Sequence, residues 1–165
     1  MHRNLFVQPK YTIDTSALLA LMNPGEKYEK ETFKRLWQDI CVLCDKDKIV
    51  SHIEVYKEIK EGGVKDQILW VKEHKSIFQK YDLPAEGRVI QDIGSKGANF
   101  VNFIEQGKQK STHADPWLVA QAKLNNLILI AEESPKKSNI PIVCQGMGVK
   151  CLNLLGLMKE ENWTY

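Results

Sequence analysis

The hydrophobic positions of the chain fall into short apolar or β-branched runs that alternate with longer stretches of helical spacing. Strand-type runs occupy residues 11–13, 49–50, 127–130 and 149–152. The uninterrupted run at 127–130 is typical of a strand covered on both faces, and hence of a parallel sheet. This alternation predicts an α/β fold, a three-layer α/β/α sandwich with a short central parallel sheet, in a single domain over residues 1–165.

Helical spacing fills the intervals between these runs. We expect helices after residue 14, over about residues 26–44, 64–80 and 87–105, and after residue 115, with breaks at Leu83-Pro84 and Gly94–Gly97 and a last helix capped by Asn153. Ser51 and Glu54 match a capping box, a serine at the N-cap and a glutamate three residues later, for a helix that ends at Gly62-Gly63. This interpretation gives Glu54 a structural role and leaves Glu58, one turn further along, without one.

Composition narrows the class of protein. The 165 residues are 43% hydrophobic and 27% charged with a formal net charge of +2, which argues against a purely electrostatic nucleic-acid binder. No apolar segment is long enough to span a bilayer, and the N-terminus lacks the apolar core of a signal peptide. We therefore expect a soluble, cytoplasmic protein that does not enter a membrane.

Two of the four cysteines are spaced as in redox or zinc sites. Cys41 and Cys44 form a Cys-x-x-Cys pair, which occurs in redox and zinc sites. The pair lies inside a helical apolar pattern, and Cys144 and Cys151 have the wrong spacing for a second zinc half-site. We interpret the cysteines as reduced core residues.

Acidic residues stand at several positions that an α/β fold brings together. Asp14 and Glu133 directly follow strand-type runs, so both are expected at the carboxyl edge of the sheet, where ligands gather in open α/β folds. Asp115 starts a strongly apolar helix, and Glu58 lies in a helix that begins just after a strand. Converging carboxylates suit Mg²⁺ or Mn²⁺, so the residues predict an acid-rich site and no more than that.

Simpler roles exist for most of these side chains. Asp14 and Asp115 could each cap the helix that follows, and Glu132 competes with Glu133 for the position after the strand. His113, beside Asp115, could be a general base or an exposed loop histidine. Four lysines flank two of the acids and could contact phosphates or only solvent; they are Lys108, Lys110, Lys136 and Lys137.

The motifs that carry these acids resemble those of PIN-domain nucleases. Tyr-Thr-Ile-Asp14-Thr-Ser-Ala-Leu resembles their opening strand and Glu54-Val-Tyr-Lys-Glu58-Ile the helix with their second acid. His-Ala-Asp115-Pro-Trp is similar to the helix start with the third acid, and Ala131-Glu132-Glu133 stands where a Thr-x-Asp is usual. A prokaryotic PIN-like subfamily also shares Ser-x-x-Glu-Val-Tyr-x-Glu, Ala-Asp-Pro-Trp and a late Ile-Pro-x-Val-Cys segment, here residues 140–144.

The resemblance implies a metal-dependent endoribonuclease that cleaves single-stranded RNA, often the toxin of a toxin–antitoxin pair with an antitoxin protein as partner. By this resemblance, Asp14, Glu58, Asp115 and Glu133 would ligate Mg²⁺ or Mn²⁺, and Ser16 would position an acid or a water. RNA or DNA as substrate and a homodimer as assembly stay open.

Two other functions are considered. Ala131 and Glu133 depart from the usual Thr-x-Asp, which favours a PIN-fold module that binds protein or RNA and has weak catalysis. A phosphatase with Asp14 as nucleophile is disfavoured, because Ser16 replaces the second acid of the usual Asp-x-Asp pair.

Overall fold

A central parallel sheet organises the molecule, which we describe from a computed structural model over residues 8–106, 113–135 and 139–165. The strands lie in the order β3-β2-β1-β4-β5 and every neighbouring pair is parallel. They are β1 (Tyr11–Ile13), β2 (Ile49–His52), β3 (Phe78–Gln79), β4 (Ile128–Ile130) and β5 (Cys151–Leu152).

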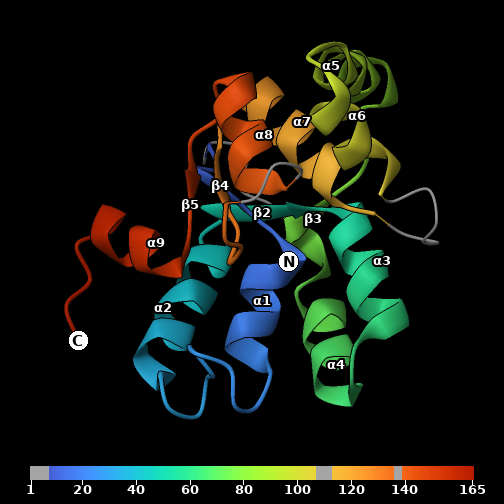
Figure 1. Ribbon diagram of the computed structural model, residues 1–165. Coiled ribbons are helices and arrows are strands. Elements are labelled where there is room, and N and C mark those ends of the chain that lie inside the picture. Colours follow the sequence, from blue (N-terminus) through green and yellow to red (C-terminus); the bar gives the residue numbers. More distant parts are fainter. Residues whose placement is uncertain (1–7, 107–112, 136–138) are drawn as a thin grey trace.

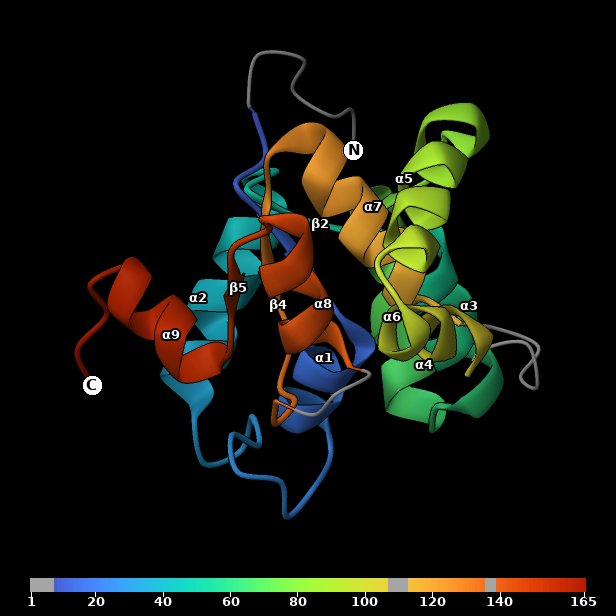
Figure 2. The same cartoon turned by 45° about the horizontal axis from the view of Figure 1, so that its top comes forward.

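Helices form a layer on each face of this sheet (Figure 1). One layer holds α1 (Thr15–Met22), α2 (Lys34–Asp45), α3 (Ile53–Gly62) and α4 (Lys65–Glu73). The other holds α5 (Leu83–Ser95), α6 (Ala98–Glu105), α7 (Asp115–Asn125) and α8 (Ile140–Met147). Figure 2 shows the last helix, α9 (Leu154–Glu160), beside β5 and on the opposite side of the molecule from α5 and α6. The predicted three-layer α/β/α sandwich is confirmed.

Strand β1 lies at the centre of the sheet, and its side chains are completely enclosed. Tyr11 and Ile13 have no exposed surface, and they pair in register with Ile128 and Ile130 of β4. From β1 the chain proceeds outward to β2 and β3, then returns across the sheet to β4 and β5. The strand order therefore reverses between β1 and β4, which is where open α/β sheets form ligand-binding crevices.

The helix predicted over residues 26–44 begins later than expected, at Lys34, because local side-chain bonds organise residues 26–33 as turns. The Glu29 carboxylate accepts hydrogen bonds from the Gly25 N–H and, at 2.8 Å, from the Thr32 hydroxyl. Such short-range bonds offer the backbone an alternative to a helix. The buried Tyr28 ring fixes the turns against Phe33.

The capping box predicted at Ser51 is wrong by one residue. Ser51 belongs to β2, and its hydroxyl donates to the Ile13 carbonyl at 2.7 Å. His52 is the N-cap of α3, because its Nδ1 accepts the Glu54 N–H at 3.1 Å. The Glu54 side chain is consequently available for a different partner. The predicted end of this helix at Gly62-Gly63 is confirmed.

The helix predicted over residues 64–80 is also too long. Helix α4 ends at Glu73, and a 3₁₀ turn (Lys75–Ile77) leads into β3, which pairs with β2 through Ser51 and Phe78. Pro84 lies in the first turn of α5 and does not interrupt a helix, and Ala114, not Asp115, is the N-cap of α7.

Two predicted features of the chain are found in the structure. Asn153 caps α9 by accepting the Gly156 N–H at 2.8 Å. All four cysteines are free thiols; Cys44 and Cys144 are buried, and Cys41 and Cys151 are half-buried.

Candidate functional site

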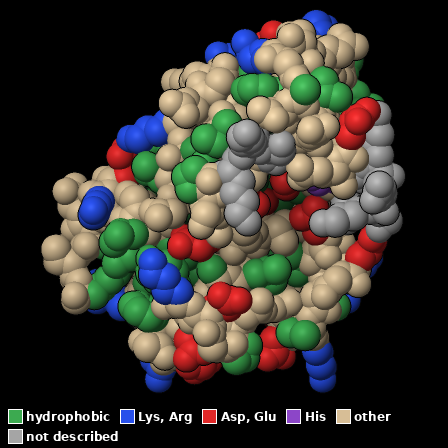
Figure 3. All heavy atoms as spheres, in the orientation of Figure 1, with side chains coloured by type: hydrophobic (Ala, Val, Ile, Leu, Met, Phe, Trp, Pro, Cys, Tyr) green, Lys and Arg blue, Asp and Glu red, His purple; other side chains and the backbone are tan. Residues whose placement is uncertain are grey.

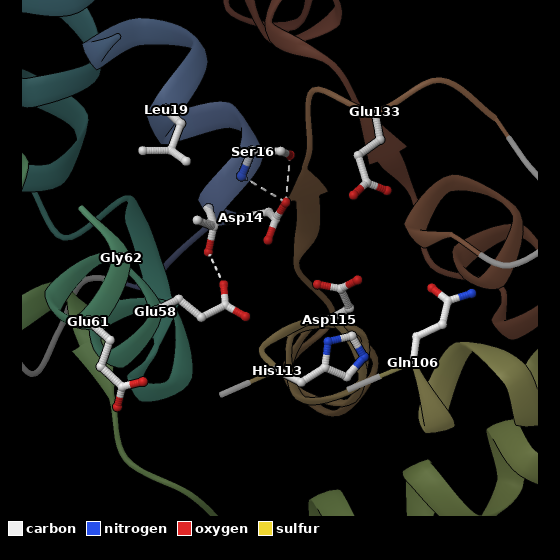
Figure 4. Close-up of a pocket in the computed structure, with 11 residues that line it drawn as sticks. Asp14, Ser16, Leu19, Glu58, Glu61, Gly62, Gln106, His113, Asp115 and Glu133 are labelled. Carbon is white, nitrogen blue, oxygen red and sulfur yellow. Dashed lines mark hydrogen bonds between the residues drawn. The ribbon is translucent and has the colours of Figure 1, made fainter. Parts of the chain in front are cut away.

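An open cleft lies at the carboxyl edge of the sheet, at the switch point between β1 and β4. Its volume is about 840 Å³. We call it the acidic cleft, and its walls are Asp14, Thr15, Ser16, Leu19, Glu58, Glu61, Gly62, Gln106, His113, Asp115 and Glu133. Figure 3 shows acidic side chains gathered in a hollow of this face. All four acids predicted from the sequence therefore share one cleft, and in Figure 4 their carboxylates point toward the same space.

Asp14 projects from the end of β1 and is only 2% exposed. Its Oδ2 accepts the Ser16 N–H at 3.0 Å and the Ser16 hydroxyl at 2.5 Å, which caps α1. Its Oδ1 is buried and has no hydrogen-bond partner within the described part of the chain. Burial raises the pKa of Asp14 to about 6 against the opposing effect of the Ser16 bonds, and the charges of Glu133 and Glu58 raise it further. The cap explains one oxygen of Asp14 and leaves the other bare.

Ser16 connects the ends of the two central strands. Its hydroxyl donates to Asp14 and accepts the backbone N–H of Glu132 at 3.0 Å. Ser16 therefore lines the acidic cleft and holds the Asp14 carboxylate, and its predicted role of positioning an acid or a water stays a prediction.

Glu58 joins three helices around the cleft. Its Oε2 accepts a hydrogen bond from the Thr15 hydroxyl of α1, and its Oε1 accepts the Ala114 N–H at 2.9 Å, at the start of α7. These bonds fix the orientation of the carboxylate and leave lone pairs for a cation. Thr15 was not selected as a site residue from the sequence, although its place between Asp14 and Ser16 is a signal that could have identified it.

Three side chains that could bind a metal ion come together at the N-terminus of α7. One atom each from Glu58, His113 and Asp115 can be chosen so that all lie within 4.8 Å of one another. The His113 Nε2 is 3.1 Å from the Phe103 carbonyl oxygen, which can only accept, so Nε2 carries a proton and, in the neutral ring, Nδ1 is the nitrogen with the lone pair. His113 is thus a half-buried residue of the cleft and not an exposed loop histidine.

The structure distinguishes the two acids after β4. Glu132 turns away from the cleft, and its Oε2 accepts the Leu154 N–H at 2.9 Å at the start of α9. Glu133 faces the cleft, and its Oε2 accepts the Ile140 N–H at 3.3 Å at the start of α8. Glu133 and Asp14 line the cleft but lie outside the group of three described above. The lysines predicted to flank the site, at 108, 110, 136 and 137, lie outside the described residues.

A second acid-bearing cluster lies near the same edge, around the ends of β2 and β3. We call Glu54, Lys57, Tyr81, His52 and Glu86 the paired cluster. Glu54 accepts hydrogen bonds from Lys57 at 2.6 Å and from the Tyr81 hydroxyl. Burial raises the pKa of Glu54, but these two partners outweigh it and hold the pKa below its usual value. Glu86 is buried 3.5 Å from His52, so the acids of this cluster face cations or donors.

The fold and the cleft define an α/β protein with an acid-lined pocket at the switch point of its sheet. The chain belongs to the family described as "domain of unknown function (DUF4411)", whose sequence model matches residues 11–165. No curated protein matches the chain. Among residues 8–106, 113–135 and 139–165, no helix has the length and apolar character that crossing a membrane requires.

Proposed function

We propose that the protein is a divalent-metal-dependent nuclease that hydrolyses phosphodiester bonds of single-stranded RNA. The observation that carries the proposal is the convergence of Asp14, Glu58, Asp115 and Glu133 in one open cleft at the sheet switch point. Four carboxylates in one cleft repel one another, and a bound cation would offset that repulsion. Burial is the main cause of the raised pKa of Asp14, and the charges of Glu133 and Glu58 raise this pKa further.

The donors present fit Mg²⁺ or Mn²⁺. The bare, buried Oδ1 of Asp14 is an oxygen without a partner among the described residues, and the group of Glu58, Asp115 and His113 adds carboxylates and one imidazole. Mg²⁺ and Mn²⁺ prefer oxygen ligands of this kind. Such an ion would lower the pKa of a water and neutralise charge on the phosphate under attack.

Specific side chains would prepare this chemistry. Thr15 and the Ala114 N–H hold the Glu58 carboxylate toward the cleft, and Ser16 does the same for Asp14. His113, with Nδ1 unprotonated in its neutral form, is a candidate proton acceptor at the rim of the cleft.

The choice of RNA rests on the resemblance of these motifs to PIN-domain nucleases. The same resemblance suggests a toxin–antitoxin context, with an antitoxin protein as partner. Both are proposals that rest on the motifs around Asp14, Glu58 and Asp115.

Cleavage of a labelled single-stranded RNA tests the proposal. Purified wild type should cleave it with Mn²⁺ or Mg²⁺ and stop when EDTA is added, and Asp14→Asn should be inactive while its circular dichroism spectrum is unchanged. Equal cleavage by wild type and Asp14→Asn would mean a contaminating nuclease and would overturn the assignment.

A weakly catalytic PIN-fold binding module is the second candidate. It is favoured by the fourth acid, because Glu133 is bonded to the N-terminus of α8 and lies outside the group formed by Glu58, His113 and Asp115. This candidate predicts RNA or protein binding that does not depend on Asp14 and no metal-dependent cleavage.

A further inference from the structure

A smaller pocket lies beside the acidic cleft, between α1 and the turn from α3 to α4. Its volume is about 250 Å³, and we call it the side pocket. Its walls are Thr15, Leu19, Asn23, Glu58, Ile59, Gly62, Gly63, Val64 and Gln67, four of which also line the acidic cleft: Thr15, Leu19, Glu58 and Gly62. Figure 4 shows Leu19 and Gly62 across the cleft from Glu133. The two spaces therefore share a wall that includes Glu58.

We propose that the side pocket binds one nucleobase of the RNA strand, adjacent to the phosphate that is cleaved. This inference rests on the proposed nuclease function. A volume of about 250 Å³ is below the roughly 300–1,000 Å³ of pockets for drug-sized ligands, so it suits a single ring system. Leu19, Ile59 and Val64 supply apolar surface, and bases bind where their faces pack and their edges find hydrogen bonds.

The hydrogen bonds of the pocket wall determine which group faces a ligand. The Val64 N–H can only donate, and it donates to Gln67 Oε1 at 2.9 Å. The other end of the Gln67 amide is therefore Nε2, which donates to Asn23 Oδ1. Gln67 is only 4% exposed, so its amide has little access to water and depends on these two hydrogen bonds, which fix the orientation of the amide.

Asn23 is consequently left with its amide donor. Its Oδ1 is used by Gln67, and its Nδ2 makes no hydrogen bond to any residue within the described ranges. An N–H donor on a wall that also carries the apolar side chains of Leu19, Ile59 and Val64 fits a ring nitrogen or carbonyl oxygen of a base. The side pocket thus combines packing surface with one oriented donor.

Two glycines at the end of α3 shape the entrance. A Cβ at Gly63 would collide with the Ile59 carbonyl and come within 2.9 Å of Gln67 Oε1, so Gly63 is required by the wall itself. A Cβ at Gly62 would meet no atom within 4 Å, and Gly62 lines both the side pocket and the acidic cleft. Gly62→Leu therefore adds a bulky side chain to the shared wall without a clash at its Cβ.

The test combines this variant with RNA that lacks a single base. A set of oligoribonucleotides, each with one abasic ribose, is cleaved by wild type, by Gly62→Leu and by the control Gly87→Leu. Gly87 is also helical with open space around its Cβ and lines none of the pockets described above. Because base contacts of this kind are worth about tenfold or more, one abasic position should raise the KM of wild type and Gly87→Leu by about tenfold.

Gly62→Leu should show the raised KM on intact RNA and no further change at the abasic position. Asn23→Asp keeps the acceptor for Gln67 but replaces the donor with a charged oxygen, so it should weaken the binding of intact RNA more than that of the abasic RNA. General repulsion by the added charge would weaken both equally and would contradict the role of Asn23.

The outcomes separate the two proposals. The side pocket is overturned if wild type cleaves every abasic RNA with the KM of intact RNA. It is also overturned if an abasic position raises the KM of Gly62→Leu as much as that of wild type. Both results leave the proposed nuclease function in place. Absence of cleavage by wild type overturns the nuclease function, and the side pocket with it.

Discussion

Helix α3 contributes one glutamate to each of two acid-bearing regions near the carboxyl edge of the sheet. Glu54 belongs to the paired cluster, where Lys57 and Tyr81 compensate its charge and hold its pKa below the usual value. Glu58, one turn later, is held by neutral donors from Thr15 and Ala114 and faces other acids of the cleft. In the paired cluster, side chains of the protein balance the charge of the glutamate. In the acidic cleft, a bound cation could do so.

The same contrast distinguishes Asp14 from a simple helix cap. A carboxylate that only caps a helix has its pKa lowered by the bonds it accepts. Asp14 accepts two bonds from Ser16, yet its pKa is raised to about 6 because burial and two neighbouring carboxylates outweigh them. The acidic cleft therefore carries an electrostatic cost that the paired cluster does not.

The largest expected effect separates the two glutamates of α3. Glu58→Gln should reduce RNA cleavage more than about 100-fold, because losing even an outer partner of a metal ligand costs about 10- to 100-fold. Glu54→Gln should cleave RNA at nearly the wild-type rate. Its free energy of unfolding in urea should fall by about 1–2 kcal/mol, because a neutral amide replaces the charged acceptor of the hydrogen bonds from Lys57 and Tyr81. Similar cleavage losses in both variants would erase the distinction between the regions.

The pH dependence of stability is expected to be dominated by Asp14 in metal-free protein. Its folded-state pKa of about 6 is above the value of about 3.9 for an unfolded chain, so the folded state takes up a proton first. Stability should therefore rise as pH falls from about 7 to about 4, by on the order of 2–3 kcal/mol.

Asp14→Asn is the control for this prediction. Urea unfolding in the presence of EDTA should show a flatter pH dependence for the variant, and at pH above 6 the variant should be the more stable protein. A wild type that instead loses stability as pH falls toward 5 would contradict the assigned direction of the Asp14 shift.

A smaller effect is expected from the hydroxyl that orients Glu58. Thr15→Val keeps the shape of the side chain and removes its bond to the Glu58 carboxylate, so Mn²⁺ affinity should fall about tenfold. Thr32→Val is the matched control, because Thr32 makes the same hydroxyl bond to Glu29 on the surface. A calorimetric titration in which both variants bind like wild type would show that Thr15 is not needed for positioning.

The sequence predicted the parts of the site that local pattern determines. Asp14 follows a β-branched run, Asp115 starts an apolar helix, and both signals lie within a few residues of the acid itself. The choice between Glu132 and Glu133 could not be made, because it depends on α8 and α9, whose N-termini each bind one of the two side chains. Glu54 was assigned to a cap that His52 makes instead, and its partner Tyr81 is 27 residues away in the chain.

The missed elements of the fold have similar causes. The two residues of β3 are defined by pairing with β2, which apolar spacing cannot reveal in so short a strand. Helix α8 was not predicted as a helix, although Pro141 in its first turn and Gly148 at its end, with a φ of 66°, are recognisable boundary signals. The central strands were predicted well because burial on both faces makes their residues continuously apolar.

Calorimetric titration of Mn²⁺ into metal-free protein tests the central claim most directly, because it requires neither a substrate nor an assumed sequence preference. Wild type and Glu54→Gln should bind Mn²⁺ with the same affinity at pH above 6, and Asp14→Asn and Asp115→Asn should show strongly weakened binding or none. Equal binding by wild type and both aspartate variants, or no binding by wild type, would contradict the account of the acidic cleft as a metal centre.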